Sequence, residues 1–314
     1  MKWHELKAHW RRVRQSAMFF GMFATGVRVG ANLLLLPVLL SKLPTADLAL
    51  WWVFGSLGGF VNLADFGFGS TIVRVYSYLW AGAEDFDAEG LRPHSGNTEP
   101  NRPRIRQLNV TVGYFYWLLS AGATLLIAVI GTLLLFKPVA AVSDPRLAWF
   151  AWLVQIFLIG YGLGSNRWML ACQGLGRMRE LQASNLFGGL AYVAVATVLL
   201  LNGRGLFGLL IASFIRSVIT RTYCKSVYRR VVPNVPGEHI KPEMGIMKRL
   251  WPNASKLGVI SIGTFLLANG NVLICSQFLD DKATASFEAL GQSRFMIPMF
   301  GLMCSPGTFG TTLR

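Results

Sequence analysis

Long apolar runs are the feature of this sequence that most restricts how the chain can fold. They recur in blocks of roughly twenty residues, the length at which a helix crosses the ~30 Å hydrocarbon core of a bilayer. Hydrophobic residues make up 53% of the 314 residues and charged residues only 14%, whereas a soluble domain carries about 25% charged residues. The pattern therefore predicts an all-α fold, a polytopic membrane helix bundle.

The apolar runs predict about eight transmembrane helices. We expect them at residues 16–40, 48–80, 108–136, 147–172, 182–201, 205–224, 254–279 and 284–304. The second run is too long for one crossing, so its lower end must project from the membrane or break. The basic start of the chain leads directly into the first run without a cleavage site, which indicates that this run stays in the protein as an anchor.

Lysines and arginines are distributed unequally over the predicted loops. With a cytoplasmic N-terminus, the inside segments hold 19 of these residues and the outside loops hold five. Because the cytoplasmic loops of membrane proteins are enriched in Lys and Arg, we predict that the N-terminus is cytoplasmic. The same rule accounts for the net charge of +15, so this charge does not indicate a nucleic-acid partner.

Two long cytoplasmic segments divide the chain. Residues 81–107 are polar and interrupted by prolines. Residues 225–252 combine prolines with the basic stretch MKRLWPNASK, which is typical of a linker that ends in a segment lying on the membrane surface. We therefore predict a six-helix lobe at 1–224, a basic cytoplasmic linker at 225–252, and one helix pair at 253–314.

The helix pair at 253–314 resembles the start of a second lobe. Residues 274–293 faintly repeat the pattern of residues 39–57, since each leaves a long helix through a short turn and enters another helix through small and aromatic residues. Transporters are often built from such repeats, with the substrate site between them near the bilayer midplane. We expect a second lobe of which most is missing, as in a truncated or frameshifted gene.

Ionisable residues occur at the depth where a charge is most costly. Their spacing from flanking aromatic and basic residues places Arg28 and Asp65 near the midplane of consecutive helices. A charge at that depth costs about 2.5–3.5 kcal/mol to insert. One interpretation is a structural ion pair that holds the two helices in register. The alternative is that both belong to a functional site.

Arginines outnumber acids within the apolar runs, so that pairing cannot neutralise them all. The acids in these runs are Asp65 and Glu288. The arginines in them include Arg28, Arg74, Arg167, Arg216 and Arg294. A guanidinium can bind phosphate oxygens through two parallel hydrogen bonds. We therefore predict a cavity for an anionic substrate, with Asp65 as the charge partner of Arg28, lined by Arg28, Arg74, Arg216 and Arg294.

Small and polar residues accompany these charges. Gly67 and Gly69 follow Asp65 directly and indicate a joint at which the helix can bend. Pro37 is expected to kink the first helix, because it removes a backbone hydrogen bond. Amide side chains that we expect to continue the cavity lining are Asn32, Asn269 and Asn271. GxxxG pairs at 26–30, 55–59 and 160–164 are typical of close helix packing.

The stretch LPTADLALWWVFGSLGGFVNLADFGFGSTIVR resembles the second-helix signature of polysaccharide (O-antigen type) flippases. These belong to the multidrug/oligosaccharidyl-lipid/polysaccharide exporter superfamily. The resemblance rests on a small and aromatic entry and on an L-x-D-x-G-x-G element carried by Leu63, Asp65, Gly67 and Gly69, with Arg74 beyond it. The basic N-terminus and the restart LGVISIGTFLLANGNVLICSQFL are also similar, so the resemblance extends over essentially the whole chain.

This resemblance implies two six-helix lobes around a central cavity in the bacterial inner membrane. Members move an isoprenoid-diphosphate-linked oligosaccharide to the outer leaflet by alternating access, for the synthesis of surface polysaccharides such as O-antigen, lipopolysaccharide or exopolysaccharide. It implies no enzymatic activity and no cofactor. The implied partners are the lipid-linked oligosaccharide diphosphate, membrane lipid and other membrane proteins of polysaccharide assembly.

Three other functions stay open. One is a multidrug exporter of the same superfamily, although a cation exporter should have acids dominating its cavity. Another is a membrane-bound glycosyl- or phosphotransferase, in which Asp85 and Asp87 hold a divalent metal. No further ligand joins that pair in the sequence, and the four cysteines and four histidines are scattered without the spacing of a metal site. The third is a non-functional remnant.

Overall fold

The computed structural model describes most of the chain between residues 17 and 278. The described residues are 17–84, 86–87, 90–91, 99–140, 142, 144–233, 235, 237 and 240–278. Within them, side chains are not described at residues 17–20, 22, 28, 29, 32, 62, 86–87, 90–91 and 264–278.

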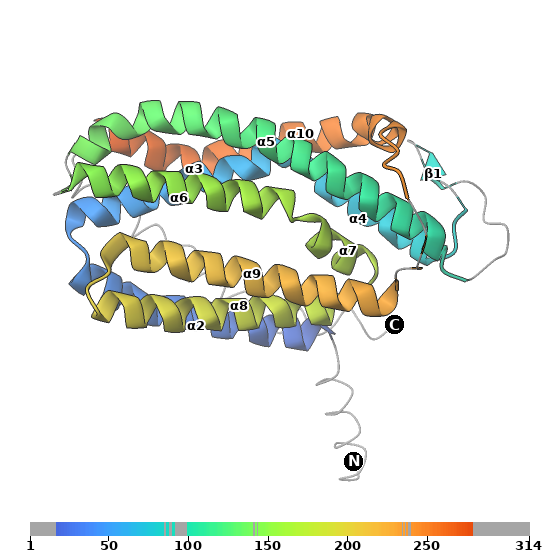
Figure 1. Cartoon of the computed structure of the whole chain (residues 1–314), viewed down its shortest axis with the longest axis horizontal. Helices are drawn as coiled ribbons and strands as arrows, with labels where there is room; N and C mark the ends of the chain where they lie inside the picture. Colours follow the sequence, from blue (N-terminus) through green and yellow to red (C-terminus); the bar gives the residue numbers. More distant parts are fainter. Residues whose placement is uncertain are drawn as a thin grey trace, which may run out of the picture.

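The described chain is helical apart from two very short strands, as the sequence predicts. Its helices are α2 (Ala17–Lys42), α3 (Thr45–Asp65), α4 (Phe68–Trp80), α5 (Arg102–Ala140), α6 (Pro145–Gly164), α7 (Arg167–Gly174), α8 (Met178–Leu201), α9 (Gly205–Val231) and α10 (Gly245–Phe278). The strands β1 (Phe86–Asp87) and β2 (Gly90–Leu91) pair antiparallel in the segment between α4 and α5. The long helices run along the same axis (Figure 1).

Five helical stretches in the described chain are long and apolar enough to cross a membrane. They are Thr45–Asp65, Arg102–Ala140, Pro145–Gly174, Met178–Leu201 and Gly205–Val231. The end of α2, Leu33–Lys42, is also apolar. The described parts of two further predicted runs, 16–40 and 254–279, also fall within helices, and the run at 284–304 lies outside the described residues. The fold is therefore that of a multi-pass membrane protein with at least five candidate spans.

Two of the predicted helices are interrupted. The long run at 48–80 is divided into α3 and α4 by a break at Phe66 and Gly67. The run at 147–172 is divided into α6 and α7 at Ser165 and Asn166. Each break leaves a shorter helix, α4 or α7, and these two short helices pack against each other.

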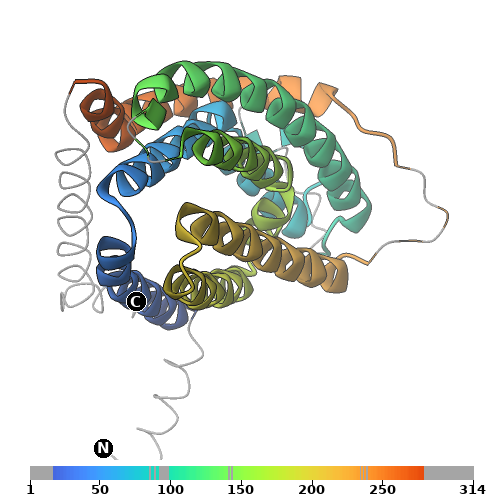
Figure 2. The ribbon, with the colours of Figure 1, turned by 60° about the vertical axis from the view of Figure 1, so that its left-hand side comes forward.

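The helices form two groups. On one side α8 packs against both α2 and α9, and on the other α5 packs against α3 and α6 while α10 packs against α3 and α4. α7 joins the groups because it contacts α4 and α9, and α6 also contacts α9. Figure 2, turned by 60° from Figure 1, shows α6 and α9 facing each other where the groups meet.

The two ends of the bundle differ in charge. α4 and α9 end, and α5 and α8 begin, at an end that we call the basic end. The lysines and arginines described near it include Arg102, Arg104, Arg106, Arg177, Arg179, Arg229, Arg230, Lys248 and Arg249. The opposite end carries Lys42, Lys137, Arg146 and Arg204.

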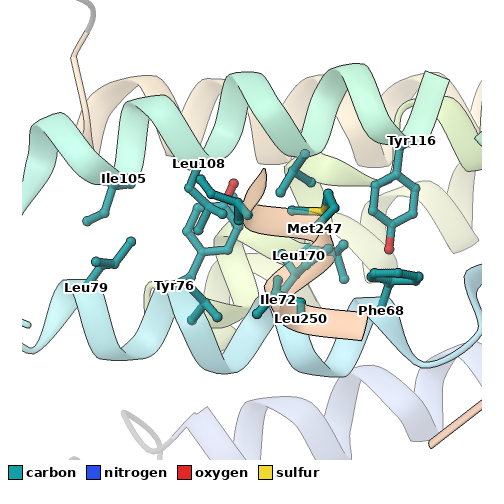
Figure 3. Close-up of a cluster of buried hydrophobic side chains, with 14 of the residues drawn as sticks. Phe68, Ile72, Tyr76, Leu79, Ile105, Leu108, Tyr116, Leu170, Met247 and Leu250 are labelled. Carbon is teal, nitrogen blue, oxygen red and sulfur yellow. The ribbon is translucent and has the colours of Figure 1, made fainter. Parts of the chain in front are cut away.

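Separate apolar cores hold each region together. Near the basic end, Ile72, Tyr76, Leu108 and Tyr116 are fully buried with residues of α7 and α10 (Figure 3). A second core joins α3, α5 and α6 around Trp152, and a third joins α2 to α8 and α9. Inside a membrane, an apolar side chain that leaves such a core meets lipid rather than water. The stability of the packing therefore depends on how closely the side chains fit rather than on the apolar area they bury.

The three GxxxG pairs differ in how closely other residues approach their glycines. A Cβ placed on Gly164 would lie 2.8 Å from the Trp117 ring, and one on Gly160 would lie 3.0 Å from the Thr124 hydroxyl. Gly160 and Gly164 therefore let α6 approach α5 closely, as predicted. A Cβ on Gly26, Gly30 or Gly55 meets open space, so the packing role predicted for those three glycines is wrong for the described part of the chain.

The segment predicted as a linker at 225–252 is largely helical. α9 continues to Val231, and α10 already begins at Gly245. Only residues 232–244 connect the two helices. The basic stretch MKRLWPNASK thus belongs to the first turns of α10, which Figure 1 shows nearly end-on while the rest of α10 runs along the bundle. Pro252 lies within this helix and explains the bend.

Candidate functional site

The break between α3 and α4 is built from left-handed backbone. Phe66 has φ 43° and Gly67 has φ 76°. Only glycine adopts this conformation without steric cost. The position is also crowded, since a Cβ on Gly67 would lie 2.6 Å from the carbonyl oxygen of Ala254 in α10. Gly67 therefore serves both the turn of the chain and the close approach of α10.

Asp65 is bound at this break. Its Oδ2 accepts a hydrogen bond of 2.9 Å from the backbone N–H of Gly69, and its Oδ1 accepts one from the Tyr116 hydroxyl of α5. Figure 3 shows Tyr116 extending from α5 toward the start of α4, close to Phe68. The first N–H groups of a helix have no partner within it. Asp65 thus caps α4 and ties its beginning to α5.

The ion pair predicted between Arg28 and Asp65 stays a prediction, because the Arg28 side chain lies outside the described side chains. The described partners of Asp65 are Gly69 and Tyr116. α2, which carries Arg28, packs mainly against α8 and meets α3 only slightly. Contact between the two helices is therefore slight in the described chain, and α3 packs mainly against α10 and α5.

The other arginines predicted for the cavity are placed separately. Arg74 is exposed on α4. Arg216 is half-buried on α9, with its guanidinium 5.9 Å from the ring centre of Tyr192 on α8. Arg216 thus lies toward α8, in the other group of helices from Arg74. Arg294 lies outside the described residues.

The remaining predicted residues are partly described. Gly69 is buried at the start of α4, where a Cβ would lie 2.7 Å from Oδ2 of Asp65. Pro37 is exposed within α2, and the helix continues through it. Asn32, Asn269 and Asn271 lie on helices, but their side chains are outside the described ones. The roles of hinge and polar lining therefore stay predictions.

A cluster of cationic and aromatic side chains, not proposed as a site from the sequence, lies where α7 meets α9. The guanidinium of Arg167 lies 4.4 Å from the ring centre of Trp168, and Nζ of Lys225 lies 5.7 Å from the same ring. Arg221, one turn before Lys225 on α9, lies 5.7 Å from the ring of Tyr161 on α6. We call Arg167, Trp168, Arg221 and Lys225 the α7–α9 basic cluster.

The cations of this cluster differ in their hydrogen bonds to the rest of the protein. Arg221 donates to the carbonyl oxygen of Gly162 at 2.8 Å and to that of Ser217 at 3.3 Å, so it fastens α9 to α6. Arg167 is half-buried against Gly113 of α5, yet it makes no hydrogen bond or ion pair within the described residues. The donors of this half-buried guanidinium are therefore left for an anion or for water.

A buried hydroxyl lies beside this cluster. Tyr228 of α9 is only 2% exposed, its ring centre lies 5.5 Å from that of Trp168, and within the described residues its hydroxyl has no hydrogen-bond partner. No carboxylate of the described chain forms an ion pair with Arg167, Arg221 or Lys225. The cluster therefore carries uncompensated positive charge next to an unused donor, which suits an anion.

One sequence signal could have indicated the cluster. Arg221 and Lys225 are four residues apart and thus share one face of a helix. Arg167 was recognised as lying within an apolar run, but its proximity to α9 depends on the break at Ser165 and Asn166, which the sequence did not predict. Comparisons of the chain with protein-family models, with curated proteins and with solved structures find no match.

Proposed function

We propose that the protein is a flippase-type transporter that moves an isoprenoid-diphosphate-linked oligosaccharide across the bacterial inner membrane. In this proposal its N-terminus is cytoplasmic, and it serves surface polysaccharide synthesis together with other assembly proteins. The proposal rests on the sequence resemblance and is supported by the candidate membrane spans. It needs neither a cofactor nor a catalytic step.

The observation that carries the proposal is the uncompensated charge of the α7–α9 basic cluster. Phosphate oxygens match the paired N–H groups of a guanidinium, and the interaction strengthens where water is scarce. Arg167 and Lys225 flank Trp168 with no carboxylate nearby in the described chain. A cationic drug would be repelled there, so the cluster favours a phosphate-bearing substrate over the cargo of a multidrug exporter.

The charge asymmetry of the bundle supports the orientation. Arginines and lysines gather at the basic end, and such residues are enriched on the cytoplasmic side of membrane proteins. The α7–α9 basic cluster lies in the half of the bundle nearer this end. It is thus positioned for a substrate whose diphosphate enters from the cytoplasmic leaflet.

Transport can be tested in proteoliposomes that contain the full chain and a fluorescent polyisoprenyl-diphosphate sugar. We expect the protein to raise the fraction of lipid that a membrane-impermeant quencher reaches with time, relative to liposomes without protein. Equal quenching in both preparations would reject the flippase function. The formation of a new glycosidic bond from a nucleotide sugar would instead indicate a transferase.

The role of Arg167 can be tested by binding. We expect Arg167→Ala to weaken binding of the lipid diphosphate by about tenfold, since a hydrogen bond to a charged group contributes about 1.5–3 kcal/mol. Arg167→Lys keeps the charge but loses the paired geometry, so its affinity should be intermediate. Arg204→Ala, which removes an exposed arginine at the opposite end, is the control and should bind normally.

A further inference from the structure

A continuous apolar seam follows the contact between α3 and α5. Three cavities of about 290, 450 and 580 Å³ lie along it, and each is lined in part by Ala64. The α5 residues that line the cavities are spaced three or four positions apart between Phe115 and Gly131, so a single face of α5 lines all three. We call this the α3–α5 seam.

The length of the seam restricts what can fill it. Phe115 and Gly131 are 16 residues apart on one helix, or about 24 Å at 1.5 Å per residue. One leaflet supplies only about 15 Å of hydrocarbon, which is half of the ~30 Å core. A phospholipid chain in one leaflet therefore leaves part of the seam empty, whereas a longer chain fills it beyond the midplane.

The seam has a cationic end. The cavity nearest the start of α10 is lined by Phe66, Phe68, Met247, Lys248 and Trp251. Lys248 is exposed at its edge, and Trp251, half exposed, stacks on Phe66 with ring centres 5.7 Å apart. Tryptophan and lysine are typical of the membrane–water boundary. This end of the seam thus lies where a lipid phosphate is expected.

The first turns of α10 fit such a boundary. Ile246, Met247 and Leu250 are buried against the bundle, while Lys248 and Arg249 are exposed. The bend at Pro252 turns this amphipathic segment away from the axis of the bundle (Figure 1). An exposed cation at the boundary attracts an anionic headgroup.

We propose that the α3–α5 seam binds the chain of a long polyisoprenyl phosphate, with the phosphate beside Lys248. The inference rests on the proposed function, because such a lipid is the carrier part of the substrate. It adds a first binding place for the carrier lipid, on the outer side of α3 and α5, which the phosphate has to leave before it binds the α7–α9 basic cluster. The length of the seam favours this occupant over an ordinary phospholipid.

Gly122 offers a direct test. It lines the middle cavity, is exposed, and a Cβ added to it meets open space, so a larger side chain there fills the seam without a clash. Binding of three probes to the purified full chain is measured by native mass spectrometry. The probes are a long polyisoprenyl phosphate, farnesyl phosphate and dipalmitoyl phosphatidylglycerol.

We expect the long polyisoprenyl phosphate to bind best, and Gly122→Leu to weaken it by about tenfold, because several buried CH₂ groups are displaced. Farnesyl phosphate fills only the part of the seam nearest Lys248, so Gly122→Leu should weaken its binding less than that of the long lipid. Ala121→Leu, the adjacent exposed position outside the seam, is the matched control. Lys248→Gln should weaken both isoprenyl phosphates by about fivefold, and Lys248→Arg should not.

Two results would overturn the inference. One is unchanged affinity of the long lipid in a Gly122→Leu protein whose unfolding temperature is that of the wild type. The other is equal binding of phosphatidylglycerol and the long lipid, which would identify an ordinary lipid site. The transport assay separates the two proposals, since lipid movement without a Gly122 effect rejects only the seam, and seam binding without movement rejects only the flippase function.

Discussion

At the scale of single residues, Asp65 holds the break between α3 and α4. Asp65→Ala leaves the Tyr116 hydroxyl and the Gly69 N–H without their partner. Losing the partner of a buried donor costs about 1–3 kcal/mol, so we expect the free energy of unfolding in detergent to fall by that amount. Asp65→Asn keeps an acceptor and should cost less. Full stability of Asp65→Ala would show that the carboxylate is not a structural cap.

The same residue allows the Arg28 pairing to be tested. If Arg28 binds Asp65, removing one partner strands a charge at a cost of about 3–5 kcal/mol, while removing both costs less. Folded yields of Arg28→Ala, Asp65→Ala and the double variant form the cycle. A parallel cycle of Asp65→Ala, Tyr116→Phe and the double variant measures the hydrogen bond between Asp65 and Tyr116. Additive losses in the Arg28 cycle would contradict the ion pair.

Gly67 is a second residue whose replacement has a defined expectation. Gly67→Ala should destabilise the protein by more than about 1 kcal/mol, because a left-handed φ of 76° and a 2.6 Å approach to the Ala254 carbonyl both oppose a Cβ. Gly122→Ala adds the same methyl group to an open position and should be neutral or stabilising. Thermal unfolding of the two variants compares them directly.

At the scale of elements, the fit of α6 against α5 depends on Gly160 and Gly164. A Cβ on Gly164 would lie 2.8 Å from the Trp117 ring, so Gly164→Leu should separate the two helices and lower the unfolding temperature markedly. Gly26→Leu is the matched control, because a Cβ there meets open space. Equal unfolding temperatures for both variants would mean that α5 and α6 are not closely packed.

At the scale of the whole molecule, the charge difference between the two ends predicts the orientation in the membrane. In a variant without native cysteines, single cysteines at Thr45 and Asn202 should react with an impermeant thiol reagent added outside the cell. Single cysteines at Ala81, which directly follows α4, and at Glu243, whose side chain pairs with Arg104, lie toward the basic end and should react only after the membrane is opened. Labelling of Thr45 solely from the cytoplasmic side would reverse the orientation.

The sequence by itself determined the helical class and the position of most long helices, because apolar runs of membrane length and turn-forming residues are local properties. It also placed the joint after Asp65, since Gly67 and Gly69 stand next to a charge that a bilayer tolerates poorly. The tertiary structure alone decided that α2 packs on α8, that Asp65 binds Tyr116, and that Arg167 meets Lys225 around Trp168. These contacts join residues tens of positions apart, and within a membrane the choice of neighbouring helix depends on the fit of their surfaces rather than on their hydrophobicity.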